Sequence, residues 1–341
     1  MADEPHDPTP YLTHRERRRL VWTSVLVALA LVVFVALAVW GVMRLSSGTP
    51  GSPSSLPSPT PVDRPLYVDP ASTTVAAAQK DARFEPLAEV PQAKWLTSWS
   101  TVQTAERDTA TYLDGAEAAG QVPVLVLYQI PQRDCGSNAR GGLANDDEYL
   151  EWIDAVVRGL DGHTDARVIV EPDALAMAGR CTRESERTEL LAETVERLAR
   201  TGASVYLDAG HSRWVDADVM ARRLVESGVA GIRGFATNVS NFRSTQDERI
   251  YAESVREQLH RLGVDDVHYL IDVSRNGASV PEGDFCNPDA ARIGQRPSLY
   301  AGTALDGLLW IKNPGESDGP CDGAPARGFW PDGALRVMGE G

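Results

Sequence analysis

Acidic side chains follow one apolar run after another along this sequence. The runs and their carboxylates are Val124–Tyr128 with Asp134, Val168–Val170 with Glu171 and Asp173, Val205–Leu207 with Asp208, Tyr269–Ile271 with Asp272, and Leu308–Ile311 with Glu316 and Asp318. Asp, Asn and Gly are common wherever a strand turns into a loop, so any one of these positions alone says little about chemistry. Five in succession indicate a site built from carboxylates, which can act in pairs as general acid and general base.

Aromatic and basic side chains accompany these carboxylates, namely Tyr128, His211, Trp214 and Lys312. A flat aromatic face can cover the apolar face of a pyranose ring, and a carboxyl pair can cleave a glycosidic bond. The combination therefore favours sugar chemistry. Neither an EF-hand-type calcium loop nor an H-E-x-x-H zinc motif is present, and we expect no metal and no cofactor. For His211, substrate contact and a structural role both remain open.

The N-terminal region predicts export of the rest of the chain. Residues 20–43 form an apolar run long enough to cross a hydrocarbon core of roughly 30 Å as a helix. Four arginines lie within residues 15–19 and one, Arg44, comes directly after the run, so the positive-inside rule places residues 1–19 in the cytoplasm. We expect a single-pass membrane anchor. The alternative is a signal peptide cleaved near Ala36–Ala38, which would make the protein secreted.

Composition separates a linker from a working domain. Residues 44–65 contain six prolines among Ser, Gly and Thr, which predicts an extended stalk, and we expect residues 66–341 to form the working domain. The formal net charge of −15 argues against a nucleic-acid partner, and we expect a monomer. Because the four cysteines show no C-x-x-C spacing, disulfides are favoured outside the cytosol.

Short apolar runs alternate with helical patterns through the domain, which is typical of βα units. The predicted strands are Lys94–Ser98, Val122–Tyr128, Arg167–Glu171, Ser204–Asp208, Gly234–Asn238, Tyr269–Val273 and Leu308–Lys312. The predicted helices are Ala105–Ala119, Asp147–Leu160, Arg183–Arg200, Asp216–Ser227 and Thr245–Leu262. Seven strands predict a closed or nearly closed α/β barrel, with an open doubly wound sheet as the alternative. In such barrels the chemistry lies at the carboxyl ends of the strands.

Several motifs together resemble glycoside hydrolase family 6, the inverting cellulases. They are, in order, Tyr67-Val68-Asp69-Pro70, Trp95, Tyr128-x-x-Pro131-x-Arg133-Asp134-Cys135, Glu171-Pro172-Asp173-x-Leu175, Asp208-Ala209-Gly210-His211-Ser212-x-Trp214, Thr237-Asn238-x-Ser240-Asn241, Asp272-x-Ser274-Arg275-Asn276-Gly277 and Trp310-Ile311-Lys312-x-Pro314-Gly315-Glu316-x-Asp318-Gly319. The resemblance covers nearly the whole domain and implies a distorted seven-stranded parallel barrel that cuts β-1,4-glucan. Because long loop insertions are absent, it also implies an open cleft and internal cutting.

The resemblance also implies roles for individual residues. Asp173 would be the general acid, Asp134 would hold its proton, and Asp318 would be the base. The substrate would be bound by Trp95, Tyr128, Asp208, His211, Trp214, Asn238, Lys312 and Glu316, with the two tryptophans as stacking platforms. The disulfides would be Cys135–Cys181 and Cys286–Cys321.

Four positions depart from the family pattern: Arg140, Phe242, Phe285 and Pro320. None of them is a catalytic aspartate, although Phe285 replaces a common tryptophan platform. Two alternatives to a cellulase remain open, a non-catalytic glycan-binding protein on the same scaffold and a hydrolase of another glucan. Retention of both Asp134 and Asp173 argues against the first.

Overall fold

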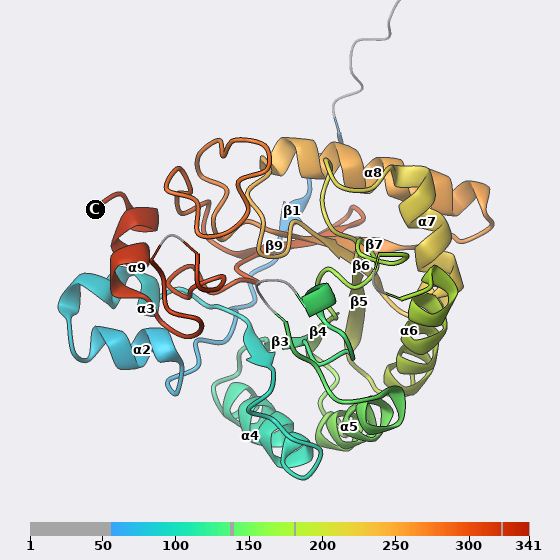
Figure 1. The fold of residues 1–341 in the computed structure, drawn as a ribbon, viewed down its shortest axis with the longest axis horizontal. Coiled ribbons are helices and arrows are strands. Elements are labelled where there is room, and N and C mark those ends of the chain that lie inside the picture. Colours follow the sequence, from blue (N-terminus) through green and yellow to red (C-terminus); the bar gives the residue numbers. More distant parts are fainter. Residues whose placement is uncertain (1–55, 137–139, 181, 322, 341) are drawn as a thin grey trace, which may run out of the picture. The chain divides into compact units, whose positions relative to one another are not determined.

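The computed structural model describes residues 56–136, 140–180, 182–321 and 323–340 (Figure 1). The predicted membrane segment 20–43, most of the predicted linker and Cys181 lie outside these ranges. None of the helices within the described ranges is both long enough and apolar enough to cross a membrane. Residues 58–341 form one unit, and the helices and strands of the described residues all belong to it.

One curled sheet organises this unit (Figure 1). Its strands are β1 (Thr60–Pro61), β2 (Lys94–Leu96), β3 (Val124–Leu127), β4 (Arg167–Val170), β5 (Ser204–Asp208), β6 (Gly234–Thr237), β7 (His268–Asp272), β8 (Ser298–Ala301) and β9 (Leu305–Leu309). Their order is β1-β8-β9-β7-β6-β5-β4-β3-β2. From β9 to β2 all neighbours are parallel, whereas β8 pairs with β9, and β1 with β8, in antiparallel fashion.

The expected count of seven strands was wrong, because within the described residues the sheet contains nine strands. The seven predicted strands are its parallel part, and each overlaps the observed strand. The two strands that were missed lie beyond β9, with β8 next to it and β1 at the edge of the sheet. β1 includes a proline, and Tyr300 and Ala301 of β8 are not buried, so neither segment carries the continuous apolar run of a strand buried on both faces.

Contacts between the two ends of the parallel part bring β2 close to the end of β9. The backbone N–H of Ala93 donates to the carbonyl oxygen of Trp310 at 3.0 Å. The indole N–H of Trp95 donates to the carbonyl oxygen of Ile311 at 2.7 Å. The carboxyl ends of distant strands therefore surround one space, as a nearly closed barrel requires.

Helices cover the outer face of the sheet (Figure 1). The long ones are α4 (Ala105–Ala118), α5 (Asp146–Gly159), α6 (Glu184–Leu198), α7 (Ala217–Glu226) and α8 (Thr245–Arg261). Each agrees with a predicted helix to within two residues at either end. Three short helices were not predicted, α2 (Thr73–Ala78), α3 (Glu85–Ala88) and α9 (Pro331–Met338). The four to eight residues of each give too little periodicity to detect.

Helix α5 shows how the sequence sets these elements. Asn145 caps it by accepting the N–H of Glu148 at 2.9 Å, and the Glu148 carboxylate accepts the N–H of Ala144 at 3.0 Å. Its apolar face buries Trp152 completely, and the indole N–H of Trp152 donates to the carbonyl oxygen of Ser100 at 2.9 Å. Helix α5 is thereby fixed to the loop that follows β2.

Alternation along the strands creates two separate apolar clusters. Val126, Ile169, Tyr206 and Leu270 point to the inside of the curled sheet. Their neighbours Leu125, Leu127, Val168, Val170, Val205, Leu207, Tyr269 and Ile271 pack beneath the helices. Because both faces are buried, the strands are rigid supports for the loops at their carboxyl ends.

Candidate active site

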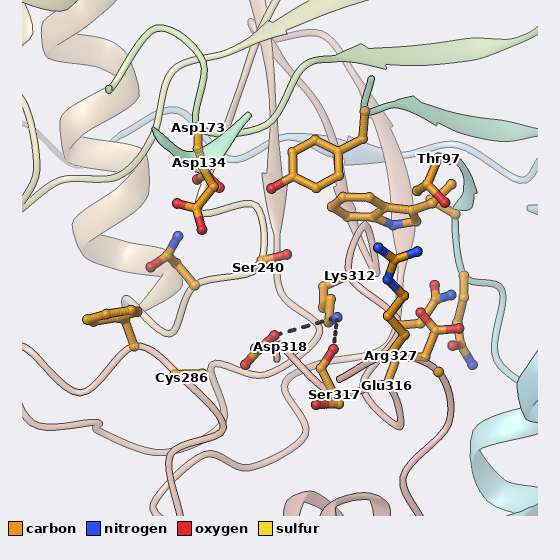
Figure 2. Close-up of a pocket in the computed structure, with 18 of the residues that line it drawn as sticks. Thr97, Asp134, Asp173, Ser240, Cys286, Lys312, Glu316, Ser317, Asp318 and Arg327 are labelled. Carbon is orange, nitrogen blue, oxygen red and sulfur yellow. Dashed lines mark hydrogen bonds and ion pairs between the residues drawn. The ribbon is translucent and has the colours of Figure 1, made fainter. Parts of the chain in front are cut away.

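A cavity of about 1070 Å³ lies at the carboxyl ends of the strands. Its lining comes from β2 and from the segments that follow β3, β4, β5, β6, β7 and β9. The predicted catalytic and substrate-binding residues line it, with the exception of Asp208 and Asn238. Figure 2 shows Asp134 and Asp173 together in this cavity, with Asp318 in another part of it beside Lys312.

Asp173 has the properties of a general acid. It follows β4 in the left-handed backbone region, with φ of 71°, and its side chain is partly buried in the cavity wall. Burial, together with the negative charges of Asp208, Asp134 and Asp318, raises the pKa of Asp173 well above its usual value. The carboxyl group therefore keeps its proton at pH values where an exposed aspartate has lost it. A strained backbone at this position is typical of functional sites.

Asp208 lies beneath Asp173 rather than in the cavity wall. It is buried at the end of β5 and accepts the N–H of Asp173 at 2.8 Å and of Gly210 at 3.1 Å. Burial raises the pKa of Asp208 to about 7, although these two hydrogen bonds oppose the shift. The resemblance implied direct contact with a sugar, but Asp208 does not line the cavity and instead holds the backbone that carries the acid.

Asn238 is also fully buried, directly after β6. Its side-chain oxygen accepts the N–H of Arg243 at 3.0 Å. Its side-chain nitrogen donates to the carbonyl oxygens of Asp272 at 2.8 Å and Arg243 at 3.2 Å. This predicted substrate ligand therefore fixes the loop between β6 and α8.

The segment around Asp134 has an unusual backbone. Gln132, Asp134 and Cys135 all have φ near +50°, where side chains are rarely found. Buried Glu171 supports the start of this segment by accepting the N–H groups of Gln129 at 3.0 Å and Ile130 at 3.1 Å. Burial also raises the pKa of Glu171 to about 7. Asp134 thus extends into the cavity from a segment held by a carboxylate below it.

Asp318 has the opposite electrostatic setting to Asp173. Its Oδ2 accepts from Arg275 at 2.7 Å and from the N–H of Asn287 at 3.1 Å, and its Oδ1 lies 3.5 Å from the Lys312 ammonium group (Figure 2). Burial alone would raise the pKa of Asp318, but the charges of Arg275 and Lys312 lower it below the usual value. Asp318 is therefore a carboxylate at neutral pH, as a base must be.

A buried carboxylate, Asp272, organises the loops around Asp318. It lies at the end of β7 and is fully buried. It accepts backbone N–H groups from Ser240 (3.0 Å), Ser274 (2.9 Å), Ile311 (3.3 Å) and Lys312 (2.9 Å). These bonds join the segments after β6, β7 and β9. Glu316 is also fixed from outside the barrel, because its Oε1 accepts from the Thr73 hydroxyl at 2.7 Å.

Aromatic rings supply the flat surfaces of the cavity. Trp95 meets Tyr128 edge-on, with ring centroids 5.3 Å apart and an interplanar angle of 89°. Trp214 lies 5.4 Å from His211. Trp99 and Phe285 also line the cavity, and the two residues are 50% and 62% exposed. Trp99 was not predicted, since no spacing signal connects it to the other aromatic residues.

His211 is a neutral donor in this arrangement. Its Nδ1 accepts the backbone N–H of Arg213 at 3.2 Å, which leaves the proton on Nε2. Burial and the charges of Arg243 and Arg213 lower the pKa of His211 to about 4. It can therefore donate a hydrogen bond across the whole neutral pH range.

The segment Gly315–Gly319 reads G-x-S-x-G, the pattern of a nucleophilic serine. Ser317 is buried, and its hydroxyl lies 2.7 Å from the carbonyl oxygen of Pro325 and 3.0 Å from that of Gly319. Because the hydroxyl is bound to main-chain oxygens and not to a histidine, this pattern does not form a nucleophile here.

The structure contains the predicted Cys286–Cys321 disulfide, with Cα atoms 6.2 Å apart. It ties the segment that contains Phe285 to the segment that contains Asp318. The other predicted disulfide involves Cys181, which lies outside the described residues.

One cluster of groups in the described ranges could hold a metal ion, Asp114 and Glu117 on α4 with His163, whose ligand atoms lie within 4.8 Å of one another. None of the three lines the cavity, and both carboxylates are exposed. The cluster is therefore separate from the residues that could act on a substrate.

Comparisons with known proteins show which family the chain resembles. Residues 64–330 match the family model described as glycosyl hydrolases family 6. Endoglucanase A of Cellulomonas fimi is 41% identical over 271 residues, which are 78% of this chain and 58% of the relative. Endoglucanase 1 of Streptomyces halstedii is 36% identical over 84% of this chain and 92% of the relative.

The structure of the endoglucanase Cel6 from Mycobacterium tuberculosis, in complex with a methyl-cellobiosyl-thio-cellobioside, matches with a TM-score of 0.76 and 43% identity. The match covers 81% of this chain and 97% of that one. The chain spans only about three fifths of the length of two curated relatives, endoglucanase A of Cellulomonas fimi and of Thermobispora bispora. From the family match and these identities together, the chain belongs to glycosyl hydrolase family 6.

Proposed function

We propose that this protein hydrolyses β-1,4-glucosidic bonds inside chains of cellulose or a related glucan, with inversion at the anomeric carbon. The observation that carries the proposal is the contrast between two aspartates of one cavity. Asp173 has a raised pKa and retains its proton, whereas Asp318 has a lowered pKa and is ionised. Inverting glycosidases require one carboxyl group in each of these states.

In the proposed reaction, Asp173 donates its proton to the glycosidic oxygen while the bond from that oxygen to the anomeric carbon breaks. A water molecule attacks the opposite face of the sugar and forms the new bond to carbon. Asp318 takes the proton of this water, directly or through a second water. The acid and base carboxyl groups of such enzymes stand roughly 6.5–9.5 Å apart, which leaves room for the attacking water.

Asp134 and Tyr128 would support the acid. The charge of Asp134 is among those that raise the pKa of Asp173, so it helps to keep the acid protonated before the reaction. Tyr128 lies at the cavity wall against Trp95, where its ring would press on the sugar at the cleavage point. Distortion of that ring toward the transition state lowers the barrier.

The remaining lining residues would bind glucosyl units on either side. Trp95 and Trp214 offer ring faces for stacking, and His211, Lys312 and Glu316 offer hydrogen bonds to hydroxyl groups. Asp208 and Asn238 would contribute from below, by holding the backbones of Asp173 and Arg243. Replacement of Asp208, which holds the acid, should therefore change catalysis more than binding.

Cleavage of cellohexaose and of a soluble cellulose derivative by the purified protein tests the activity. We expect cellohexaose to be cut at internal bonds and the viscosity of the polymer to fall before much reducing sugar accumulates. Relatives named endoglucanases support internal cutting. Release of cellobiose alone with unchanged viscosity would contradict it, and no cleavage by the folded protein would favour a glycan-binding role.

We also propose that the catalytic domain is exported, monomeric and held at the membrane by residues 20–43, with residues 44–65 as a stalk. The apolar run and its arginine flank support this placement. Fractionation of cells that produce the full chain, with protease treatment of intact cells, would test it. A domain that stays inside the cell would contradict the proposal, whereas release into the medium would indicate cleavage.

A further inference from the structure

The cavity extends well away from the catalytic aspartates. Its volume of about 1070 Å³ lies above the roughly 300–1,000 Å³ of sites that enclose one small molecule. Figure 2 shows Asp134 and Asp173 on one side of it and Thr97 and Arg327 on the opposite side. The cavity therefore has room for several sugar units in a row, and part of its wall is distant from the reacting bond.

Four residues form this distant part of the wall, and we refer to them as the outer end. They are Lys94, Ser98, Trp99 and Arg327, and all four line the cavity. The guanidinium group of Arg327 donates to the Ser98 hydroxyl at 3.0 Å, which brings the segment after β9 against the segment after β2. The reaction proposed above uses none of these four side chains.

Trp99 is unusual in its exposure. Within the described ranges, five large apolar residues are exposed, namely Trp99, Val225, Ile250, Leu262 and Phe285. The two aromatic residues among them, Trp99 and Phe285, both line the cavity. An exposed indole ring leaves a large apolar area in water, and covering that area is favourable. The position of Trp99 at a cavity wall therefore favours a ligand that covers the ring.

The Trp99 ring is also held in one orientation. Its indole N–H donates to the carbonyl oxygen of Trp95 at 3.1 Å. The ammonium group of Lys94 lies 5.5 Å from the ring centre, and Asp69 binds this ammonium group at 3.0 Å. A ring fixed in advance loses little conformational freedom when a ligand binds, so more of the contact energy becomes affinity.

The chemistry of the outer end suits a neutral glucosyl unit. A pyranose ring can place its apolar face on an indole ring, while its hydroxyl groups accept hydrogen bonds from the N–H groups of Lys94 and Arg327. Trp95 and Trp99 are joined through the Trp95 carbonyl group, and both line the cavity. One glucan chain can therefore contact both rings with different units.

We propose that Trp99 forms an outer subsite for a glucosyl unit distant from the bond that is cut, and that this subsite gives the protein a preference for longer chains. The inference rests on the proposed function, since it concerns the same glucan chain. It assigns Trp99 to binding and not to catalysis, because the outer end lies away from Asp134 and Asp173.

The test compares cellotetraose with cellohexaose as substrates of the full-length protein. Only the longer chain should fill the central part of the cavity and reach Trp99 together. In Trp99→Ala, the ratio of kcat/KM for cellohexaose to kcat/KM for cellotetraose should fall about tenfold, which corresponds to about 1.4 kcal/mol. The loss on cellohexaose should appear as a higher KM, because a distant ring binds the substrate and the transition state equally.

Two further variants show whether the aromatic face is responsible. Trp99→Phe retains a ring and should keep most of the wild-type ratio. Ile250→Ala removes another exposed apolar side chain, on α8 and outside the cavity lining, and should leave the ratio unchanged. The unfolding temperature of each variant shows whether it is folded.

The possible results separate the inference from the proposed function. An unchanged ratio in folded Trp99→Ala overturns the outer subsite and leaves the proposed function intact. A loss in kcat that is equal for both chains also overturns it, because Trp99 would then act near the reacting bond. Cleavage of neither chain by the wild type contradicts the proposed function. Calorimetry then tests the subsite, and equal affinities of wild type and Trp99→Ala for cellohexaose would overturn it.

Discussion

Replacement of Asp208 by Asn probes how the acid is prepared. Asp208 lies under Asp173, accepts its backbone N–H at 2.8 Å and contributes one of the negative charges that raise its pKa. The Asn side chain has a similar shape but no charge. The pKa of Asp173 should therefore fall, and the alkaline limb of the kcat/KM profile should move to lower pH, because Asp173 must be protonated to act.

The size of the shift depends on the state of Asp208. A nearby like charge changes a pKa by roughly one to three units. Because the pKa of Asp208 itself is about 7, its charge is only partly present near neutral pH, which favours the lower end of that range. We expect a shift of about one unit, equivalent to about 1.4 kcal/mol. Above the limb, this corresponds to a roughly tenfold loss of kcat/KM relative to wild type.

The assay is the pH dependence of kcat/KM on cellotetraose or a longer neutral oligosaccharide, from about pH 4 to 9, the span over which carboxyl groups with ordinary and raised pKa values titrate. Asp218→Asn is the matched control, since it removes the same charge from the exposed side of α7. A limb that stays in place or moves to higher pH in Asp208→Asn, with the control unchanged, would refute the electrostatic reasoning.

Three other predictions concern the rest of the cavity. Arg275→Met removes a partner of Asp318, so the pKa of Asp318 should rise. The acid limb of the kcat/KM profile should then move to higher pH. An unmoved acid limb in a folded variant would exclude Asp318 as the titrating base. Ser317→Ala should retain kcat/KM within about tenfold of wild type, because the Ser317 hydroxyl binds main-chain oxygens. A loss of about 10⁴-fold, typical of a missing catalytic-triad residue, would indicate that Ser317 is a nucleophile. Joint replacement of Cys286 and Cys321 by Ala should lower the free energy of unfolding by about 3–4 kcal/mol, because the two cysteines are 35 residues apart in the sequence. Denaturant unfolding measures this change. An unchanged free energy of unfolding would show that the disulfide does not restrict the unfolded chain.

The sequence predicted the parallel strands well because both faces of these strands are buried. Val168, Ile169 and Val170 illustrate this, since the middle residue enters the inner cluster and its neighbours pack under the helices. Such strands appear as continuous apolar runs. Strands β1 and β8 lack this signal, because β8 pairs with the edge provided by β9 and β1 pairs with β8, and neither pairing depends on the strand's own composition.

The sequence predicted which residues lie at the site but not the directions in which their side chains point. Asp173 and Asp208 each follow a buried strand, yet one reaches the cavity and the other accepts amide groups beneath it. The same holds for Glu171 and Asp272, whose carboxylates fix neighbouring loops. Residue type and spacing place a carboxylate at the end of a strand, but its orientation depends on the tertiary path of the loops.

The most direct test of the central claim is the anomer released from a neutral cello-oligosaccharide, monitored by NMR in the first minutes of hydrolysis by the wild-type protein and by Asp173→Asn. We predict that the wild type releases the α-anomer first and that the variant loses at least about 10²-fold in kcat, the typical contribution of a general acid. Initial release of the β-anomer would contradict inversion. Undiminished activity of the folded variant would contradict the assignment of Asp173 as the acid.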